Sequence, residues 1–139
     1  HLVRWVFFNL YVGNNDSHAK NLSIYSVPGP GVTLTPFYDL MCTRLYPGLS
    51  QEFAFSIGGE FKPGSMTRQH LEALAGQLGM RPQFLLRQAA DLAAKVPAGL
   101  HRALEETHPA LSHSARALAS KLAHFIESTT KKTAARFSR

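Results

Sequence analysis

Apolar residues dominate the first twelve positions of the chain, HLVRWVFFNLYV, on nearly every side of a helical repeat. This pattern predicts a buried helix over residues 1–12. Gly13 follows at the position where a glycine commonly ends a helix. Natural domains seldom begin with so many apolar side chains in need of cover, so we expect these residues to belong to a longer protein.

Polar and ionisable residues then gather in the stretch VGNNDSHAKNLSIY, residues 12–25. The runs LSIYSV (22–27) and VTLTPFYDL (32–40) have the composition of β-strands. The PGPG segment between them, residues 28–31, favours a turn. The pattern therefore predicts a polar loop followed by a β-hairpin.

The remainder of the chain has one irregular part and one helical part. Residues 41–65 are rich in glycine and proline, which predicts a long loop, and the alternating apolar residues of EFAFSI (52–57) predict one short strand within it. From Thr67 onward apolar residues recur with helical spacing. The expected helices run from a Thr67 cap to Gly79, from Pro82 to Pro97, over about 98–106, and from Ser112 or Ser114 through Leu118, Leu122, Phe125 and Ile126.

These elements predict an α+β, mostly helical fold for residues 1–139, with a small β-hairpin on a helical body. The length is enough for one domain with a core. The net charge of +6 and pI near 9.8 predict an affinity for phosphates or acidic partners. The single cysteine, Cys42, excludes an internal disulfide and fits a reducing cytoplasm. No apolar run reaches the roughly 18 residues that a membrane span needs, so we expect no membrane partner.

Three oxygen-bearing side chains are expected to come together around the predicted hairpin. Asp16 and Asn21 lie five residues apart in the loop, and Asp39 lies at the end of the second predicted strand. A hairpin returns the chain on itself, so Asn21 and Asp39 should approach each other. Carboxylate and amide oxygens are ligands that suit magnesium or manganese.

Protein kinases use this combination of residues. Their catalytic loop has an aspartate five residues before an asparagine, and a second aspartate follows a hairpin. The first aspartate accepts the proton of the attacking hydroxyl, and the other two residues hold the metal ions that bridge the nucleotide phosphates. The pattern therefore favours Asp16 as a general base, and it places Asn21 and Asp39 as metal ligands.

The motifs GNNDSHAKNLS and LTPFYDL together resemble the C-terminal kinase core of the HipA-type serine/threonine kinases, the toxins of bacterial toxin–antitoxin pairs. The resemblance continues through FAFSIGGEF and the helical tail and covers most of the chain. It implies a protein-kinase-like fold, ATP and Mg²⁺. It also implies Asp16 as the catalytic base, Asn21 and Asp39 as metal and nucleotide ligands, and a nucleotide site lined by the segments of His18, Lys20 and Tyr38.

The resemblance also implies partners. These are an antitoxin of the DNA-binding HipB type and a protein substrate such as an aminoacyl-tRNA synthetase, with DNA contacted only indirectly, through the antitoxin. The family's phosphate-covering loop and phosphate-binding lysine belong to an N-terminal lobe, and nothing here matches them. Gly58, Gly59 and Lys62 lack the spacing of a P-loop. We therefore expect residues 1–139 to be the C-terminal lobe of a kinase and to be inactive alone.

Two other classes of function remain open. The same acidic and amide residues, with the positive charge, could serve a metal-dependent nuclease, or the fold could persist as a catalytically dead interaction module. Individual roles are open as well. His18 could act as a second base, although a structural hydrogen bond is the commoner role, and Lys20 could neutralise phosphate or simply be solvated.

Overall fold

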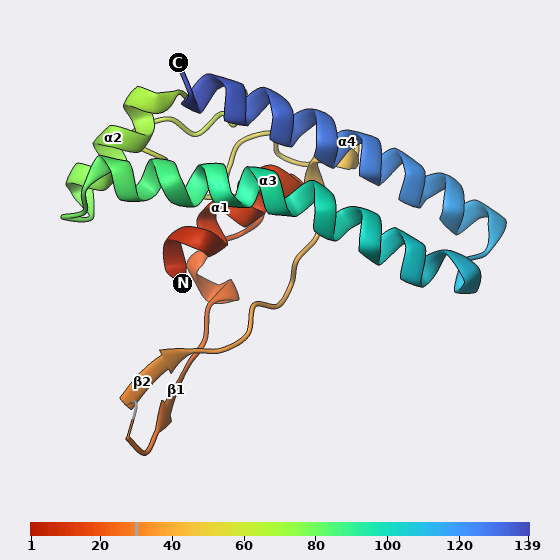
Figure 1. Ribbon diagram of the computed structural model, residues 1–139, viewed down its shortest axis with the longest axis horizontal. Helices are drawn as coiled ribbons and strands as arrows, with labels where there is room; N and C mark the ends of the chain where they lie inside the picture. Colours follow the sequence, from red (N-terminus) through yellow and green to blue (C-terminus); the bar gives the residue numbers. More distant parts are fainter. Residues whose placement is uncertain (30) are drawn as a thin grey trace.

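The computed structural model of the protein describes residues 1–29 and 31–139. Four α-helices form the body, and a two-stranded antiparallel sheet projects from it (Figure 1). The helices are α1 (Leu2–Val12), α2 (Arg68–Gln77), α3 (Pro82–Thr107) and α4 (His113–Phe137), the strands are β1 (Ile24–Val27) and β2 (Gly31–Leu34), and the 3-10 turns are η1 (Ala19–Asn21), η2 (Thr43–Leu45) and η3 (His108–Ala110). The predicted mostly helical α+β fold is confirmed.

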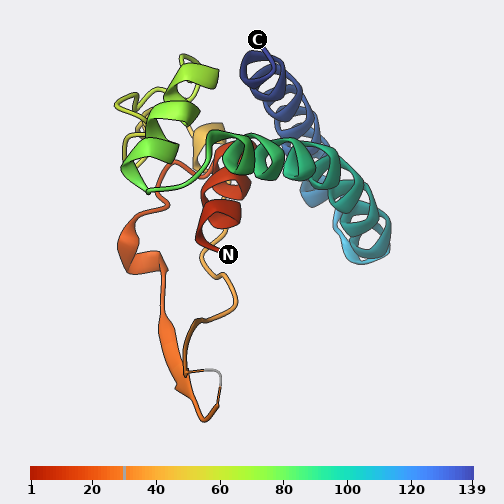
Figure 2. The ribbon, with the colours of Figure 1, turned by 60° about the vertical axis from the view of Figure 1, so that its left-hand side comes forward.

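Helices α3 and α4 run antiparallel and pack along each other, with α1 against both of them (Figures 1 and 2). Figure 2 shows the hairpin extending away from this body, and the C-terminus returning to the region of α2. The buried apolar side chains form one core. It takes Trp5, Phe7, Leu10 and Tyr11 from α1, Phe53 and Ile57 from the loop, and further members from Leu71, Leu85, Ala89, Ile126 and Phe137.

The end of α1 is fixed by close packing. Gly13 has φ 77°, in the left-handed region, and a Cβ there would lie 2.5 Å from Cε1 of Phe125. Both observations require glycine. Two residues before Gly13, the buried phenol of Tyr11 donates to the carbonyl oxygen of Ala89 at 2.9 Å. Burial raises the pKa of Tyr11. The chain therefore leaves α1 at a point that α3 and α4 define.

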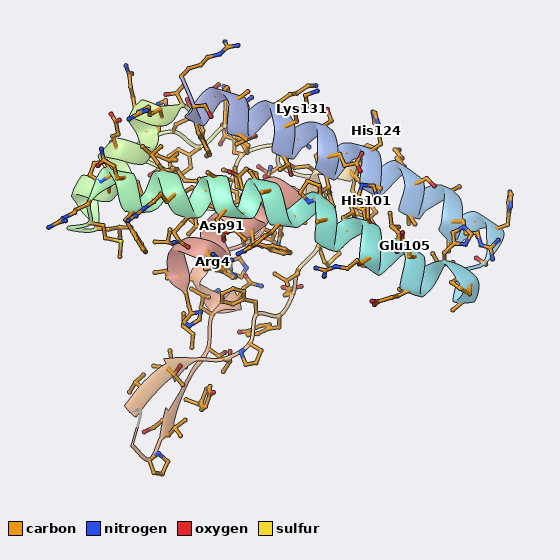
Figure 3. The ribbon with its side chains drawn as sticks, viewed as in Figure 1. Arg4, Asp91, His101, Glu105, His124 and Lys131 are labelled. Atoms are coloured by element: carbon orange, nitrogen blue, oxygen red, sulfur yellow. The ribbon has the colours of Figure 1, made fainter. Side chains whose placement is uncertain are left out.

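The sequence pattern predicted that a helix ends at Pro97 and that a separate one covers about 98–106. This prediction was wrong, because α3 continues through Pro97 to Thr107. Proline removes one intrahelical hydrogen bond and crowds the preceding turn. The following turns continue because they pack against α4. His101 Nε2, which Figure 3 labels, lies 2.9 Å from Glu127 Oε1 on that helix. Tertiary packing thus outweighs the local preference of the proline.

The strand predicted over residues 52–57 is also absent. Ile57 makes only an isolated bridge with Glu60 around the turn at Gly58 and Gly59, although Phe53 and Ile57 are buried as the alternation suggested. The Gly58 turn packs so closely on His70 that a Cβ would collide with its backbone. The segment pairs with no strand among the described residues, so burial here occurs without a sheet.

The hairpin is shorter than its predicted runs. β1 pairs with β2 from Ile24 opposite Leu34 to Val27 opposite Gly31. Thr35 N–H adds one further bond, to the carbonyl of Ser23 at 2.9 Å, and residues 36–40 continue outside the ladder. The predicted helix starts are confirmed: Thr67 forms a capping box with His70, and Ser112 caps α4. Within the part of the chain described, no helix is both long and apolar enough to cross a membrane.

Candidate active site

The candidate site lies where the loop after α1 meets the segment after β2. Asn14, which is 2% exposed, holds the two together. Its side-chain amide donates to Asn9 Oδ1 at 2.9 Å and to the backbone carbonyl of Asp39 at 3.0 Å. Asn9 in turn donates to the carbonyl of Trp5 at 2.8 Å. These hydrogen bonds therefore connect the backbone of Asp39 to the buried helix α1.

The η2 turn supports the loop from its other side. Thr43 Oγ1 accepts from the backbone N–H of Asn15 at 2.8 Å and donates to the carbonyl of Gly13 at 3.3 Å. The Asn15 amide donates to the carbonyl of Ser50 at 3.2 Å. Neither Asn14 nor Thr43 was singled out as functional from the sequence, because each bonds to a segment at least 25 residues away.

Asn21 and Asp39 lie together, as the hairpin predicted. Asn21 Nδ2 donates to Asp39 Oδ2 at 2.5 Å, while Asn21 Oδ1 accepts from the backbone N–H of His18 at 3.2 Å. Asn21 is buried at the end of η1, and Asp39 is exposed with φ 55°. A positive φ is uncommon outside glycine, although aspartate tolerates it better than most residues, and such backbone often occurs at functional sites.

Asp16 lies on the same loop with its side chain 74% exposed, and its Oδ1 is 3.9 Å from Nε2 of His18. The next residue, Ser17, is completely buried, so the loop lies against the body at this point. The carboxylate of Asp16 is therefore held by a fixed backbone while remaining open to a substrate. An exposed carboxylate of this kind can accept a proton from a substrate that binds within hydrogen-bond reach.

The remaining predicted residues fasten the loop or border it. The Tyr38 hydroxyl donates to the backbone carbonyl of Lys20 at 3.0 Å and lies 2.9 Å from Ser23 Oγ. Tyr38 thus connects the segment before Asp39 to the η1 turn. The side chains of His18 and Lys20 are exposed beside it, so both can reach a ligand.

The donor set at Asn21 and Asp39 fits a magnesium ion. Asp39 supplies an exposed carboxylate. Asn21 Oδ1 accepts from the His18 N–H, and its second lone pair could contact a metal ion, because an amide oxygen carries two. The described residues contain no cluster of three His, Cys, Asp or Glu side chains suited to a metal. Two protein ligands suit Mg²⁺, which usually keeps several waters and binds phosphate oxygens.

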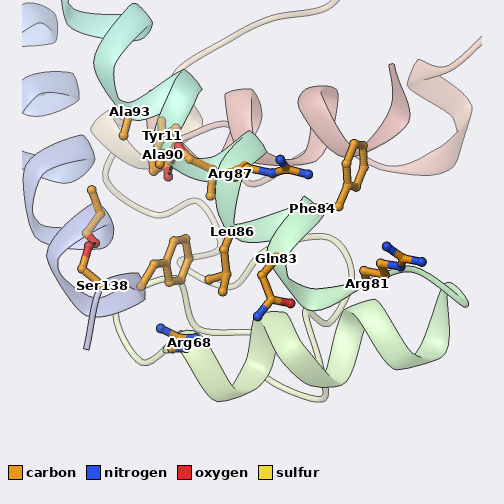
Figure 4. A pocket seen from close by; sticks show the side chains of 13 residues that line it. Tyr11, Arg68, Arg81, Gln83, Phe84, Leu86, Arg87, Ala90, Ala93 and Ser138 are labelled. Atoms are coloured by element: carbon orange, nitrogen blue, oxygen red, sulfur yellow. Dashed lines mark hydrogen bonds between the residues drawn. The ribbon is translucent and has the colours of Figure 1, made fainter.

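The body has one hollow beside the candidate site and another away from it. One, of about 470 Å³, is lined by apolar residues of α1 together with His18, Ala19 and Leu22, so it adjoins the loop. Another, of about 740 Å³, lies between α2, α3 and the end of α4 (Figure 4). None of the predicted site residues lines the second hollow. The predicted site residues therefore lie on the loop after α1 and on the segment after β2, away from the second hollow.

Comparison with known proteins shows the family of the chain. The family described as HipA-like C-terminal domain matches residues 1–100. The serine/threonine-protein kinase toxin HipA of Shewanella oneidensis is 34% identical over 96 residues, which are 69% of this chain and 22% of that protein. The Y4mE protein of Sinorhizobium fredii, whose name assigns it provisionally to the kinases, is 34% identical over 128 residues, 91% of this chain and 29% of its own.

A solved structure gives the same result. The Shewanella oneidensis complex of HipA, HipB and operator DNA contains a chain that matches with a TM-score of 0.71 and 30% identity, over 99% of this chain and 30% of that chain. The present chain therefore spans between a fifth and a third of the length of these relatives. With the family matched over residues 1–100 and the fold shared over nearly the whole chain, the protein belongs to the HipA-like C-terminal domain family.

Proposed function

We propose that the chain is the C-terminal lobe of an ATP- and Mg²⁺-dependent serine/threonine protein kinase of a toxin–antitoxin system. The observation that carries this proposal is the contact between Asn21 and Asp39 beside the exposed Asp16. Phosphoryl transfer needs positioning and charge neutralisation more than covalent chemistry. A base and one metal ligand on the loop after α1, with a second metal ligand on the segment after β2, would supply both.

Each residue has a distinct role in this proposal. Asp16 accepts the proton of the attacking serine or threonine hydroxyl. Asn21 and Asp39 would hold Mg²⁺, which when bound neutralises charge on the nucleotide phosphates. His18 contributes through its backbone, whose N–H fixes the Asn21 amide, and its ring borders Asp16. The exposed Lys20 side chain would neutralise charge on a phosphate.

The proposal extends to partners through the relatives. The solved relative is a complex of HipA with HipB and operator DNA, which supports an antitoxin of the HipB type as a partner of this protein. DNA would then be contacted through that antitoxin. The substrate is proposed to be a protein hydroxyl, in agreement with the serine/threonine kinase name of the relative, and an aminoacyl-tRNA synthetase is the candidate substrate.

An assay of phosphoryl transfer by the protein whose open reading frame encodes this chain tests the proposal. Asp16→Asn removes the proton acceptor, and general base catalysis is worth about 10²–10⁴-fold. We expect transfer of labelled γ-phosphate to fall within that range while the fold is kept, because the Asp16 side chain is exposed. Glu105→Gln, on the exposed face of α3 (Figure 3), is the charge-matched control.

Two outcomes would contradict the proposal. Near wild-type transfer by Asp16→Asn would remove Asp16 from the mechanism. Metal-dependent cleavage of nucleic acid without any nucleotide requirement would assign the same residues to a nuclease instead.

A further inference from the structure

A further hollow, lined by basic side chains, lies between η2 and the C-terminal half of α4. Its volume is about 410 Å³. Arg44, Lys121, Lys132 and Arg136 contribute positive charge to its lining, and no described residue that lines it is acidic. Figure 3 labels His124, which also lines the hollow, and the neighbouring Lys131 on this stretch of α4. The hollow therefore has one sign of charge.

Arg44 is the least satisfied of these cations. Its Nε is buried and has no hydrogen-bond partner among the described residues, and its guanidinium lies over the Phe125 ring at 5.4 Å from the centroid. Burial, and to a lesser extent the charge of Arg136, lowers the pKa of Arg44. Arg44 thus has another cation nearby and no carboxylate partner in the described part of the chain. Burying such a guanidinium costs free energy unless an anion binds to it.

Arg136 is held in place beside it by neutral acceptors. Its Nε donates to the carbonyl of Met66 at 3.0 Å, and one terminal nitrogen donates to the carbonyl of Pro63 at 2.9 Å and to Thr133 Oγ1 at 3.0 Å. These bonds fix the guanidinium without neutralising its charge. The positive field in the hollow is therefore preorganised.

We propose that this hollow binds a compact phosphate anion, of the size of a phosphate monoester or a diphosphate. Guanidinium and ammonium groups are the usual ligands of phosphate oxygens, and Ser128 and Thr129 add hydroxyl groups to the lining. A recessed pocket that contains a half-buried arginine suits a compact anion better than a nucleic-acid backbone, which follows an exposed basic surface.

The site is independent of the proposed kinase site, because it shares none of Asp16, Asn21 and Asp39. It is nevertheless connected to the same loop. The backbone N–H of Arg44 donates to the carbonyl of Gly13 at 3.1 Å, and Phe125 lies against Gly13. The anion would therefore bind behind the loop that carries Asp16.

Calorimetric titration with inorganic pyrophosphate, at constant ionic strength, tests this site. Lys121 and Lys132 are exposed, so the double variant Lys121→Gln/Lys132→Gln should remain folded, which thermal denaturation checks. We expect one pyrophosphate to bind the wild-type chain and the double variant to bind about tenfold more weakly. The control Arg102→Gln/Arg116→Gln removes the same charge from exposed positions outside the hollow and should change the affinity less than twofold.

Three results would overturn the proposal. One is no pyrophosphate binding at millimolar concentration. Another is equal weakening in the control variant, which would indicate a general effect of net charge. The third is binding of a single-stranded oligonucleotide that pyrophosphate does not displace, which would indicate an extended backbone-binding surface. Inorganic phosphate as a second ligand shows whether one phosphate group is enough.

Discussion

Two asparagines position the exposed acidic groups of the candidate site. Asn14 connects α1 to the backbone of Asp39, and Asn21 connects the η1 turn to its carboxylate. Neither side chain carries a charge, so each can be buried as long as the fold supplies its hydrogen-bond partners. Asp16 and Asp39 remain exposed and available for chemistry. In the proposed mechanism, the buried amides position the loop and the exposed carboxylates take part in the chemistry.

Asn14→Ala should lower the free energy of unfolding by about 1–3 kcal/mol, because it leaves the buried Asn9 oxygen and the Asp39 carbonyl without their donor. Ser17→Ala is the matched control. Its hydroxyl is buried and has no hydrogen-bond partner in the described chain, so its removal should be close to neutral. Urea denaturation measures both. A neutral Asn14→Ala would show that its hydrogen bonds do not hold the loop.

At the scale of elements, local sequence signals gave correct starts and ends where the chain itself supplies the cap. Gly13, Thr67 and Ser112 are such cases. They failed where a distant segment decides the outcome. Pro97 lies inside α3 because α4 packs beyond it. The alternating residues 52–57 are buried without a partner strand. The approach of Asn21 to Asp39 was predictable because a hairpin connects them, whereas the support from Thr43 comes from a loop whose path the sequence does not indicate.

Pro97→Ala should stabilise the protein by about 1–2 kcal/mol. Proline in a helix interior is about 3 kcal/mol less favourable than alanine, and alanine gives part of this back through a freer unfolded chain. Pro109→Ala, in the short η3 turn, is the control and should bring no gain. Denaturation midpoints report the difference. A loss of stability in Pro97→Ala would mean that the packing of α3 on α4 depends on the proline.

The whole molecule carries one half of what the proposed kinase needs. The proposed base and metal ligands lie on the loop after α1 and on the segment after β2. The phosphate-covering loop and lysine that the family places in an N-terminal lobe have no match in the sequence. An apolar hollow of about 470 Å³ lies beside α1 and His18. This hollow adjoins the proposed nucleotide site, and the chain spans between a fifth and a third of the length of its relatives.

The isolated 139-residue chain should accordingly bind Mg-ATP no more tightly than about millimolar, roughly 4 kcal/mol of binding free energy. Metal ligands alone leave the triphosphate half solvated and only partly neutralised. Calorimetric titration, with a labelled-phosphate assay on a bacterial extract beside it, checks both binding and activity. Micromolar affinity or clear labelling would show that these residues suffice.

The position of a bound metal tests the central claim most directly. Crystals of the protein encoded by the open reading frame, soaked with Mn²⁺ and a non-hydrolysable ATP analogue, give the metal position from anomalous diffraction. We predict a peak at coordination distance, about 2.0–2.2 Å, from a carboxylate oxygen of Asp39 and the amide oxygen of Asn21. The peak should be lost in Asp39→Ala and weakened in Asn21→Ala, because only the former removes a charge. A nucleotide-bound metal that contacts neither residue would contradict the account.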